Sequence, residues 1–372
     1  MNSKKDLDNA LDTIFRNIPD IGFWDAKNKW ISEKLANDKN WNWKSINSNS
    51  HRYGLFTLSM ILLSKDLYSL DTEKYDEKIV DFIYWVYNNL YTLETTELTY
   101  GALTSVILGK KLYNMDDLEL DIIEQSLTKA YKNIFPFFDN QNSLILIASK
   151  YFLDLKESKE QKDNLKKLTG LILSSKNNSA YFETGDIRAN YHQRIMYSLW
   201  ALAFASNYYA HDEIKTTMED IIRYVWDKRR DKKDNAFLWH PSFYFIKYKN
   251  GIKIPVYNPK SAKYLFECHQ TFFANSINFY QKFFNSDLFQ KEKEKALEWI
   301  TGNNRIHKNL NDVTGIDIPV RIMHLNGNLF IDGQQFIGSY EIGSLILSLA
   351  NKNFNSNNSL IEGDYVQNYI RH

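Results

Sequence analysis

The chain has 372 residues, and its 46 basic and 45 acidic side chains leave a formal net charge of +1. Proteins that bind nucleic acid carry a clustered basic excess, so this balance argues against DNA or RNA as a partner. Cys268 is the only cysteine, which excludes intrachain disulfides, and the longest strongly apolar run, residues 196–205, is about half as long as a membrane span.

Along the chain, one pattern recurs: a few polar or aromatic residues, which we call an opening, followed by a nearly continuous apolar helical run. It occurs six times, at intervals of 44 to 76 residues. A helix that is apolar on most faces is buried on most faces, so we expect six inner helices. Their openings lie near His51, Leu98, Asn142, Tyr191, Glu267 and Tyr340.

Amphipathic, charge-rich segments alternate with these runs and predict helices that have one face in solvent. In one of them, Ile214, Met218, Ile221 and Val225 form an apolar stripe at helical spacing. Six exposed helices that alternate with six buried ones predict a closed ring of helical hairpins; an open solenoid of helical pairs is the alternative. The exposed segments cover residues 5–16, 77–91, 118–134, 161–174, 212–228 and 288–300.

The last two intervals are longer, and each contains a hairpin signal. Asn250-Gly251 and Asn326-Gly327 both lie between apolar-rich extended runs, and both residue types tolerate the positive φ of a tight β-turn. We therefore expect one all-α domain over residues 1–372, with β-hairpin insertions at about 243–257 and 321–332 that shape a cleft at one end of the ring. Residues 352–372 are expected to form a flexible tail.

The inner helices of such a ring run in the same direction, so their N-terminal openings meet at one face. Helix N-termini present free backbone N–H groups and a partial positive charge, which suit anionic or hydroxyl-rich ligands. The openings carry proton-transfer groups, planar cations and aromatic rings, where a surface helix would carry Lys and Glu. We expect these residues to bind substrate: His51, Arg52, Tyr53, Tyr100, Asp186, Arg194, His269, Gln270 and Tyr340.

The densest polar cluster is segment 183–194, Glu-Thr-Gly-Asp-Ile-Arg-Ala-Asn-Tyr-His-Gln-Arg, which leads directly into the most apolar run. With this cluster at its mouth, the predicted ring resembles the (α/α)6 toroid of carbohydrate-active enzymes, which include glycoside hydrolases, uronate lyases and glucuronyl epimerases. Asn190-Tyr191-His192, followed by an aromatic-rich helix, is similar to the Asn-x-His segment of alginate-lyase-type toroids. The architectural similarity covers about residues 5–350, and the motif covers about ten residues.

This resemblance implies proton abstraction at C5 of a uronic acid. In the family, an Asn and an Arg neutralise the uronate carboxylate while a His or Tyr removes the proton, which leads to β-elimination or epimerisation. By this similarity, Asn190 with Arg188 or Arg194 would neutralise the acid. His192 or Tyr191 would act as the base.

Two assignments stay open within this interpretation. The family's second tyrosine corresponds to either Tyr100 or Tyr340 in this sequence. The arginines of segment 183–194 also have a structural alternative, in which they form ion pairs with Glu183 and Asp186 and do not contact a substrate.

A glycoside hydrolase is the alternative enzymatic function. It needs two carboxyl groups about 5–10 Å apart, one of which is held protonated. Glu267 and Glu341 open adjacent inner helices and are the best candidate pair in the sequence. Their structural alternative is to stabilise the helix dipoles.

Histidine, cysteine and carboxylate residues show no metal-ligand spacing and no glycine-rich phosphate loop is present, so we expect no metal and no other cofactor. Trp41 and Trp43 lie in a polar segment before the first inner helix, where exposed rings would pack on sugar faces. The first residues contain no apolar signal-peptide core, so we expect a cytoplasmic protein. Its expected partner is an oligosaccharide or small-molecule substrate, with no nucleic acid and no membrane. A cyclase and a non-catalytic binding or scaffold toroid are the alternatives from other classes.

Overall fold

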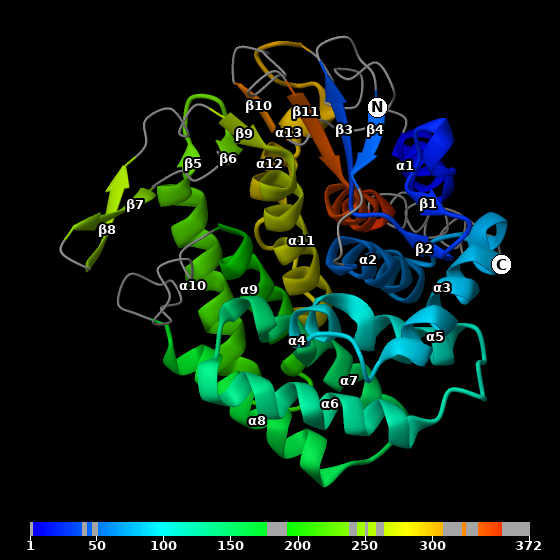
Figure 1. The fold of residues 1–372 in the computed structure, drawn as a ribbon. Helices are drawn as coiled ribbons and strands as arrows, with labels where there is room; N and C mark the ends of the chain where they lie inside the picture. Colours follow the sequence, from blue (N-terminus) through cyan, green and yellow to red (C-terminus); the bar gives the residue numbers. More distant parts are fainter. Residues whose placement is uncertain are drawn as a thin grey trace, which may run out of the picture.

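The computed structural model describes the chain except for residues 1–2, 39–42, 47–50, 177–191, 238–243, 250–251, 258–263, 308–321, 325–333 and 352–372. Within the described part, helices of two kinds alternate along the sequence and form concentric inner and outer layers (Figure 1). The tail expected at residues 352–372 lies outside the described residues. None of the described helices combines the length and apolar character that crossing a membrane requires.

The inner layer consists of the six apolar segments expected from the sequence. In α9, every residue except Gln193 is buried, which is what its nearly continuous apolar sequence predicts. The second inner helix begins with the wider turns of a π-helix and the third with the tighter turns of a 3-10 helix, and both continue into regular α-helix. Their bounds are α2 (Arg52–Tyr68), η3 (Leu98–Ala102) with α5 (Leu103–Leu112), η5 (Asn140–Leu144) with α7 (Ile145–Leu155), α9 (His192–Ala205), α11 (Glu267–Phe284) and a helix over residues 339–351.

The outer layer consists of the amphipathic segments. In α8, for example, Leu165, Leu168 and Ile172 are buried along one stripe while most of the charged residues face solvent. The last outer segment is interrupted at Leu297, so it forms two short helices instead of one. The bounds are α1 (Ser3–Phe15), α3 (Asp76–Asn89), α6 (Leu120–Ile134), α8 (Lys159–Ser174), α10 (His211–Arg229), α12 (Gln290–Ala296) and α13 (Glu298–Thr301).

The inner helices close into a ring. Consecutive inner helices from α2 to α11 pack side by side, and the helix over residues 339–351 joins α11 to α2. On one side, the Asn275 side-chain amide of α11 donates to the Ser344 backbone oxygen at 3.0 Å. On the other side, Gly343 packs directly against Thr57 of α2. The predicted closed ring of six hairpins, an (α/α)6 toroid, is confirmed, and the open solenoid is excluded.

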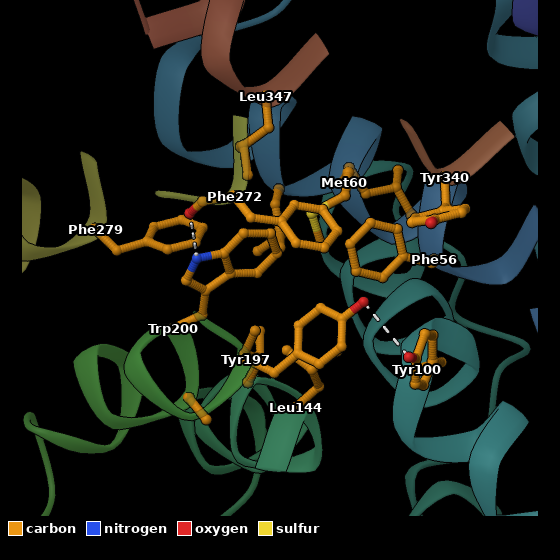
Figure 2. Packing of buried hydrophobic residues seen from close by; sticks show 14 of the residues in the cluster. Phe56, Met60, Tyr100, Leu144, Tyr197, Trp200, Phe272, Phe279, Tyr340 and Leu347 are labelled. Atoms are coloured by element: carbon orange, nitrogen blue, oxygen red, sulfur yellow. Dashed lines mark hydrogen bonds between the residues drawn. The ribbon is translucent and has the colours of Figure 1, made fainter. Parts of the chain in front are cut away.

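Aromatic side chains fill the centre of the ring (Figure 2). Phe56 of α2 lies 6.1 Å from Trp200 of α9 and 5.9 Å from Phe272 of α11, measured between ring centroids. The Trp200 indole N–H donates to the Ser276 hydroxyl at 2.9 Å, so its polar atom is satisfied inside the core. The centre of the ring is therefore a packed core.

The strands gather at the end of the ring where α11 begins (Figure 1). The predicted hairpin at 243–257 is confirmed, since β7 (Tyr244–Lys249) pairs antiparallel with β8 (Ile252–Tyr257). In the second predicted hairpin region, β10 (Ile322–His324) pairs with β9 (Tyr264–Phe266), a partner far away in sequence, and residues 325–333 are not described. The remaining pairs are β1 (Trp24–Asp25) with β2 (Trp30–Ile31) and β5 (Arg230–Asp231) with β6 (Ala236–Phe237).

A three-stranded sheet that no local sequence pattern predicts joins strands from the two ends of the chain. Its strand order is β11 (Gln334–Gly338), β3 (Lys34–Asp38) and β4 (Trp43–Ile46), all antiparallel. Immediately after β11, the Ser339 backbone N–H donates to the Glu33 backbone oxygen at 2.9 Å. The sheet therefore fixes the start of the last inner helix against the segment that precedes the first.

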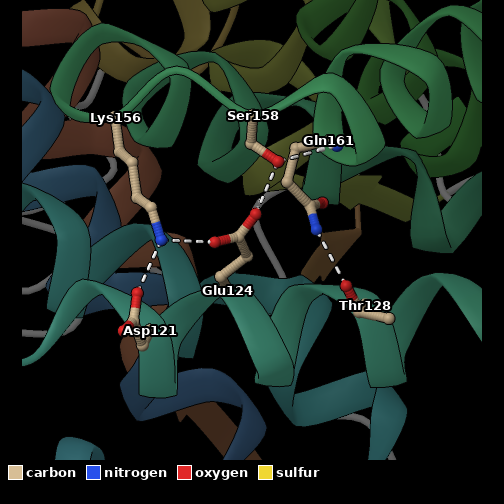
Figure 3. A network of polar contacts seen from close by, with 6 residues as sticks. All are labelled: Asp121, Glu124, Thr128, Lys156, Ser158 and Gln161. Carbon is tan, nitrogen blue, oxygen red and sulfur yellow. Dashed lines mark hydrogen bonds and ion pairs between the residues drawn. The ribbon is translucent and has the colours of Figure 1, made fainter.

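A polar network connects two neighbouring outer helices, α6 and α8 (Figure 3). The Lys156 ammonium lies 2.6 Å from carboxylate oxygens of both Asp121 and Glu124. Ser158, the N-cap of α8, accepts from the Gln161 backbone N–H at 3.3 Å, and its hydroxyl donates to Glu124. The capping residue of one helix is thereby bound to the side of the other, and this fixes their relative position.

Candidate active site at the inner-helix openings

Four tyrosines and one arginine from four inner helices meet where these helices begin. The ring centroids of Tyr53 and Tyr340 are 4.4 Å apart, and the hydroxyls of Tyr100 and Tyr197 are 3.4 Å apart (Figure 2). The Arg52 guanidinium carbon lies 4.9 Å from the Tyr53 ring centroid and 5.4 Å from that of Tyr100. This tyrosine–arginine cluster confirms that openings far apart in sequence converge on one face.

Burial and mutual contact control the ionisation of this cluster. Burial disfavours the charge of Arg52, but the neighbouring phenols of Tyr100 and Tyr53 outweigh it and raise the pKa of the guanidinium. Burial also raises the pKa of Tyr100 to about 12, although the Arg52 charge and the Tyr197 hydroxyl act in the opposite direction. The cluster therefore holds a permanent cation beside the neutral phenol of Tyr100.

The Tyr340 hydroxyl contacts two side chains that were not among the sequence-predicted site residues. The Gln193 side-chain amide donates to this hydroxyl at 3.3 Å, and the thiol of Cys268 lies 3.7 Å from it. Cys268 itself is fully buried. Because the amide donates to the phenolic oxygen, it stabilises negative charge there. Gln193 belongs to the polar segment 183–194, and its place in that segment is the sequence signal that identifies it.

His192 is buried next to His269 at the openings of α9 and α11. Its Nε2–H donates to the His269 backbone oxygen at 3.0 Å, and the two ring centroids are 4.7 Å apart. Among the described residues, no hydrogen-bond partner reaches its Nδ1 atom. Burial, together with the positive charge of Arg229, lowers the pKa of His192 to about 3. His192 is therefore a neutral imidazole whose Nδ1 carries a lone pair.

The structure places Arg194 in an ion pair that bridges two inner helices. Its guanidinium lies 2.5 and 2.6 Å from the two carboxylate oxygens of Asp139, and it also donates to the Gln141 side chain at 3.3 Å. Asp139 in turn accepts from the Gln141 backbone N–H at the start of η5. These contacts favour the structural alternative, an ion pair, over the predicted substrate contact for Arg194. The carboxylate that pairs with it is that of Asp139.

Two other predicted binding residues also make structural contacts. The Gln270 amide is bonded to both the backbone N–H and the backbone oxygen of Phe237, at 3.0 and 2.6 Å, and so holds β6 against α11. The backbone N–H of His51 donates to Glu97 at 3.0 Å, while its ring packs on Trp30 and Trp85. Burial lowers the pKa of His51, although Glu97 and Glu33 act in the opposite direction.

Glu341 is fully buried in the first turn of the last inner helix. Its carboxylate lies against the backbone at Gly338, where an added Cβ atom would come within 2.1 Å of the Oε2 atom. A side chain at position 338 would therefore force the Glu341 carboxylate to move. Glu267 is the first residue of α11, but its side chain is not described, so the predicted Glu267–Glu341 pair has no measured separation.

Several predicted site residues lie outside the described residues. Trp43 is the first residue of β4, but its side chain is not described. Within the described part of the chain, no group of three or more His, Cys, Asp or Glu side chains is arranged to hold a metal ion. The undescribed candidates are Trp41, Asp186, Arg188, Asn190 and Tyr191.

The closed ring, with its polar and aromatic openings, has the (α/α)6 toroid fold found in carbohydrate-active enzymes. No protein-family model matches the sequence, and no curated protein matches it. Solved structures do match. An α-1,6-mannanase from a Salegentibacter species, solved as an inactive variant with α-1,6-mannotetrose, has a TM-score of 0.61 and 9% identity over 95% of this chain and 100% of that chain.

Two further structures differ from the mannanase in activity. Cellobiose 2-epimerase from Bacillus thermoamylovorans matches with a TM-score of 0.61 and 12% identity, over 95% of this chain and 100% of that chain. Unsaturated glucuronyl hydrolase from Streptococcus agalactiae matches with a TM-score of 0.60 and 8% identity, over 94% and 90%. At these identities the similarity establishes the fold, and the chemistry has to be argued from the residues.

Proposed function

We propose that this protein is a carbohydrate-active enzyme that binds an acidic saccharide at the inner-helix openings and removes the proton at C5 of a uronic acid, as a lyase or an epimerase. The observation that carries this proposal is the tyrosine–arginine cluster, in which Arg52 lies 4.9 and 5.4 Å from the ring centroids of Tyr53 and Tyr100. It places a permanent cation next to phenolic acid–base groups at the end of the ring where the helices begin.

The chemistry requires this combination. Removal of a proton next to a carboxylate creates a second negative charge, so a cation or hydrogen-bond donors must stabilise the enediolate. Arg52 supplies the cation, and its planar guanidinium can bind a carboxylate through two N–H groups. In this proposal, Asn190 and Arg188 assist in neutralising the acid.

Tyr340 and His192 are the proposed proton-transfer groups whose surroundings are described. The Gln193 amide donates to the Tyr340 oxygen at 3.3 Å. This hydrogen bond stabilises the phenolate, which is the form in which Tyr340 can accept a proton. His192 carries a lone pair on Nδ1, but a pKa of about 3 makes it a weak base. We therefore assign the proton abstraction to Tyr340 and leave His192 to position α11 through the His269 backbone. Tyr191, which the motif similarity also favours, is the competing base.

The substitution that tests this function is Arg52→Met, which removes the charge and keeps most of the side-chain volume. On uronate oligosaccharides, we expect kcat/KM to fall by about 10²–10³-fold, the typical loss for one donor to a developing oxyanion. Arg223→Met, on the exposed side of α10, is the matched control and should retain full activity. Elimination is followed by the ultraviolet absorbance of the unsaturated product, and epimerisation by deuterium incorporation at C5 in D2O.

A glycoside hydrolase is the second candidate, because two of the structurally similar proteins are a mannanase and a glucuronyl hydrolase. The Glu267–Glu341 pair would then carry the reaction. Release of reducing sugar without an unsaturated product or deuterium incorporation, and its loss in Glu341→Gln but not in Arg52→Met, would replace the first proposal with this one. Absence of turnover on every saccharide tested would instead indicate a binding or scaffold protein.

A further inference from the structure

A cavity lies at the opposite end of the ring from the tyrosine–arginine cluster. Its volume is about 380 Å³, within the range of about 300–1,000 Å³ that small-molecule sites have. It begins at Asn278, eleven residues along α11, so at 1.5 Å per residue it is about 16 Å from the opening of that helix. The lining comprises Asn278, Gln290, Lys293, Glu294, Leu297, Ser348 and Asn351.

The residues that line the cavity both donate and accept hydrogen bonds, and their charges balance. Asn278, Gln290, Ser348 and Asn351 each carry an amide or a hydroxyl, and the remaining charges, those of Lys293 and Glu294, are one of each sign. Amides and hydroxyls match the hydroxyl groups of a ligand, since all of them both donate and accept. The composition therefore suits a neutral, hydroxyl-rich molecule better than an ion.

One buried acceptor in this cavity has no partner among the described residues. Asn278 is 3% exposed, and its Nδ2 donates to the Asn275 side chain at 3.2 Å. Its Oδ1 atom, in contrast, receives no hydrogen bond. An unsatisfied buried acceptor destabilises the folded protein, and a ligand hydroxyl that donates to it would remove that penalty.

Two further side chains of the cavity wall, those of Ser348 and Lys293, are held in place by hydrogen bonds. The Ser348 hydroxyl donates to Asn275 at 2.8 Å, and the Lys293 ammonium donates to Gln281 at 2.8 Å. Lys293 is 6% exposed, so a charged side chain is built into the wall. Side chains fixed in this way form a preorganised site, which loses little conformational entropy on binding.

We propose that this cavity is a second ligand site, which binds a neutral polyhydroxylated molecule of about the size of one sugar ring through Asn278 and is separate from the inner-helix openings. A hydroxyl of the ligand donates to Asn278 Oδ1, and the Leu297 side chain packs against its C–H face. The site does not depend on the proposed enzymatic function.

Titration of the full chain with D-glucose, D-mannose, myo-inositol and glycerol, followed by saturation-transfer NMR, tests this site. We expect at least one of these probes to bind saturably, and Asn278→Leu to weaken that binding at least tenfold. Because Asn278 is buried, far-UV circular dichroism and the melting temperature must show that the variant is folded. Gln290→Trp, an exposed substitution at the rim that covers the cavity, should weaken binding without any risk to the core.

Arg52→Met separates this site from the other end of the ring, because it should leave binding of the probe unchanged. Two results would overturn the proposal. One is the absence of saturable binding for all four probes; the other is binding that survives both Asn278→Leu and Gln290→Trp.

Discussion

Gly343 of the last inner helix and Thr57 of α2 are so close that a Cβ atom at position 343 would lie 2.8 Å from the Thr57 Cα atom. Because the obstacle is a backbone atom, no change of side-chain rotamer can relieve the contact. This is the place where the last inner helix reaches the first. The absence of a side chain at position 343 is therefore a condition for closing the ring.

Gly343→Ala should lower the free energy of unfolding by about 1–3 kcal/mol, because the added methyl group forces the two helices apart. Gly170→Ala in α8 is the matched control, since nothing lies within 4 Å of its added Cβ atom. There the better helix propensity of alanine should raise stability by about 0.5–1 kcal/mol. Urea unfolding measures both changes, and equal stabilisation by the two substitutions would contradict the close contact.

Arg194→Gln should destabilise the protein by about 2–4 kcal/mol, because it leaves the Asp139 carboxylate without its cation at a largely buried position. The surface pair of Lys162 and Glu157 is the control, and Lys162→Ala should change stability by less than about 1 kcal/mol. Thermal unfolding gives the comparison. A variant of unchanged stability that has a strongly raised KM would return Arg194 to the substrate-binding role predicted from the sequence.

His192 should make the protein less stable as the pH falls below 6.5. Its pKa of about 3 in the folded protein is below that of an exposed histidine, so between these values the unfolded chain binds a proton that the folded chain does not. Stability therefore rises with pH across this window, by up to about 1.4 kcal/mol per pH unit from this group.

His192→Gln should flatten the dependence of stability on pH between about 4 and 6.5, because glutamine does not titrate. The matched control is His211→Gln, which makes the same substitution at the exposed start of α10. Melting temperatures recorded at half-unit pH intervals report the slope. Identical slopes for the wild type and His192→Gln would exclude a buried neutral imidazole.

Ser158→Ala should cost about 1 kcal/mol or slightly more, because it removes the N-cap of α8 together with the hydrogen bond to Glu124 on α6. Ser174→Ala at the exposed last turn of α8 removes a hydroxyl that bonds only locally, to the Leu171 backbone oxygen, and should be nearly neutral. Chemical denaturation of both variants tests the difference. A neutral Ser158→Ala would mean that the network in Figure 3 does not couple the two helices.

The helical ring could be predicted from the sequence because its two layers have different hydrophobic patterns. The α9 segment is apolar on nearly every face and α8 on one stripe only, and this contrast is local information. The pairing of β3 with β11 is different, since it joins residues about 300 positions apart and depends on where the ring closes. No pattern within either strand indicates the other.

The residues of the site could be predicted only in part. The sequence predicts where the openings lie, because a polar residue ahead of an apolar run is a local signal. The structure brings Tyr53 and Tyr340, from two of these openings, into contact. The roles of individual residues depend on their partners in space. Arg194 contacts Asp139 from a different inner helix, and Gln193 contacts Tyr340 from the last one, so neither contact could be read from spacing.

The pairing of β11 with β3 has a consequence for the order in which contacts form while the chain is synthesised. The Glu33 backbone oxygen receives its bond from Ser339, so this contact has to wait until about 300 further residues have been synthesised. At about 5–20 residues per second, that is a delay on the order of tens of seconds. For most of that time the apolar face of α2 that later meets the last helix lacks this partner, and the matching face of α11 lacks it from the synthesis of α11 onward. A nascent chain of this protein therefore presents a substantial surface to chaperones before its ring closes.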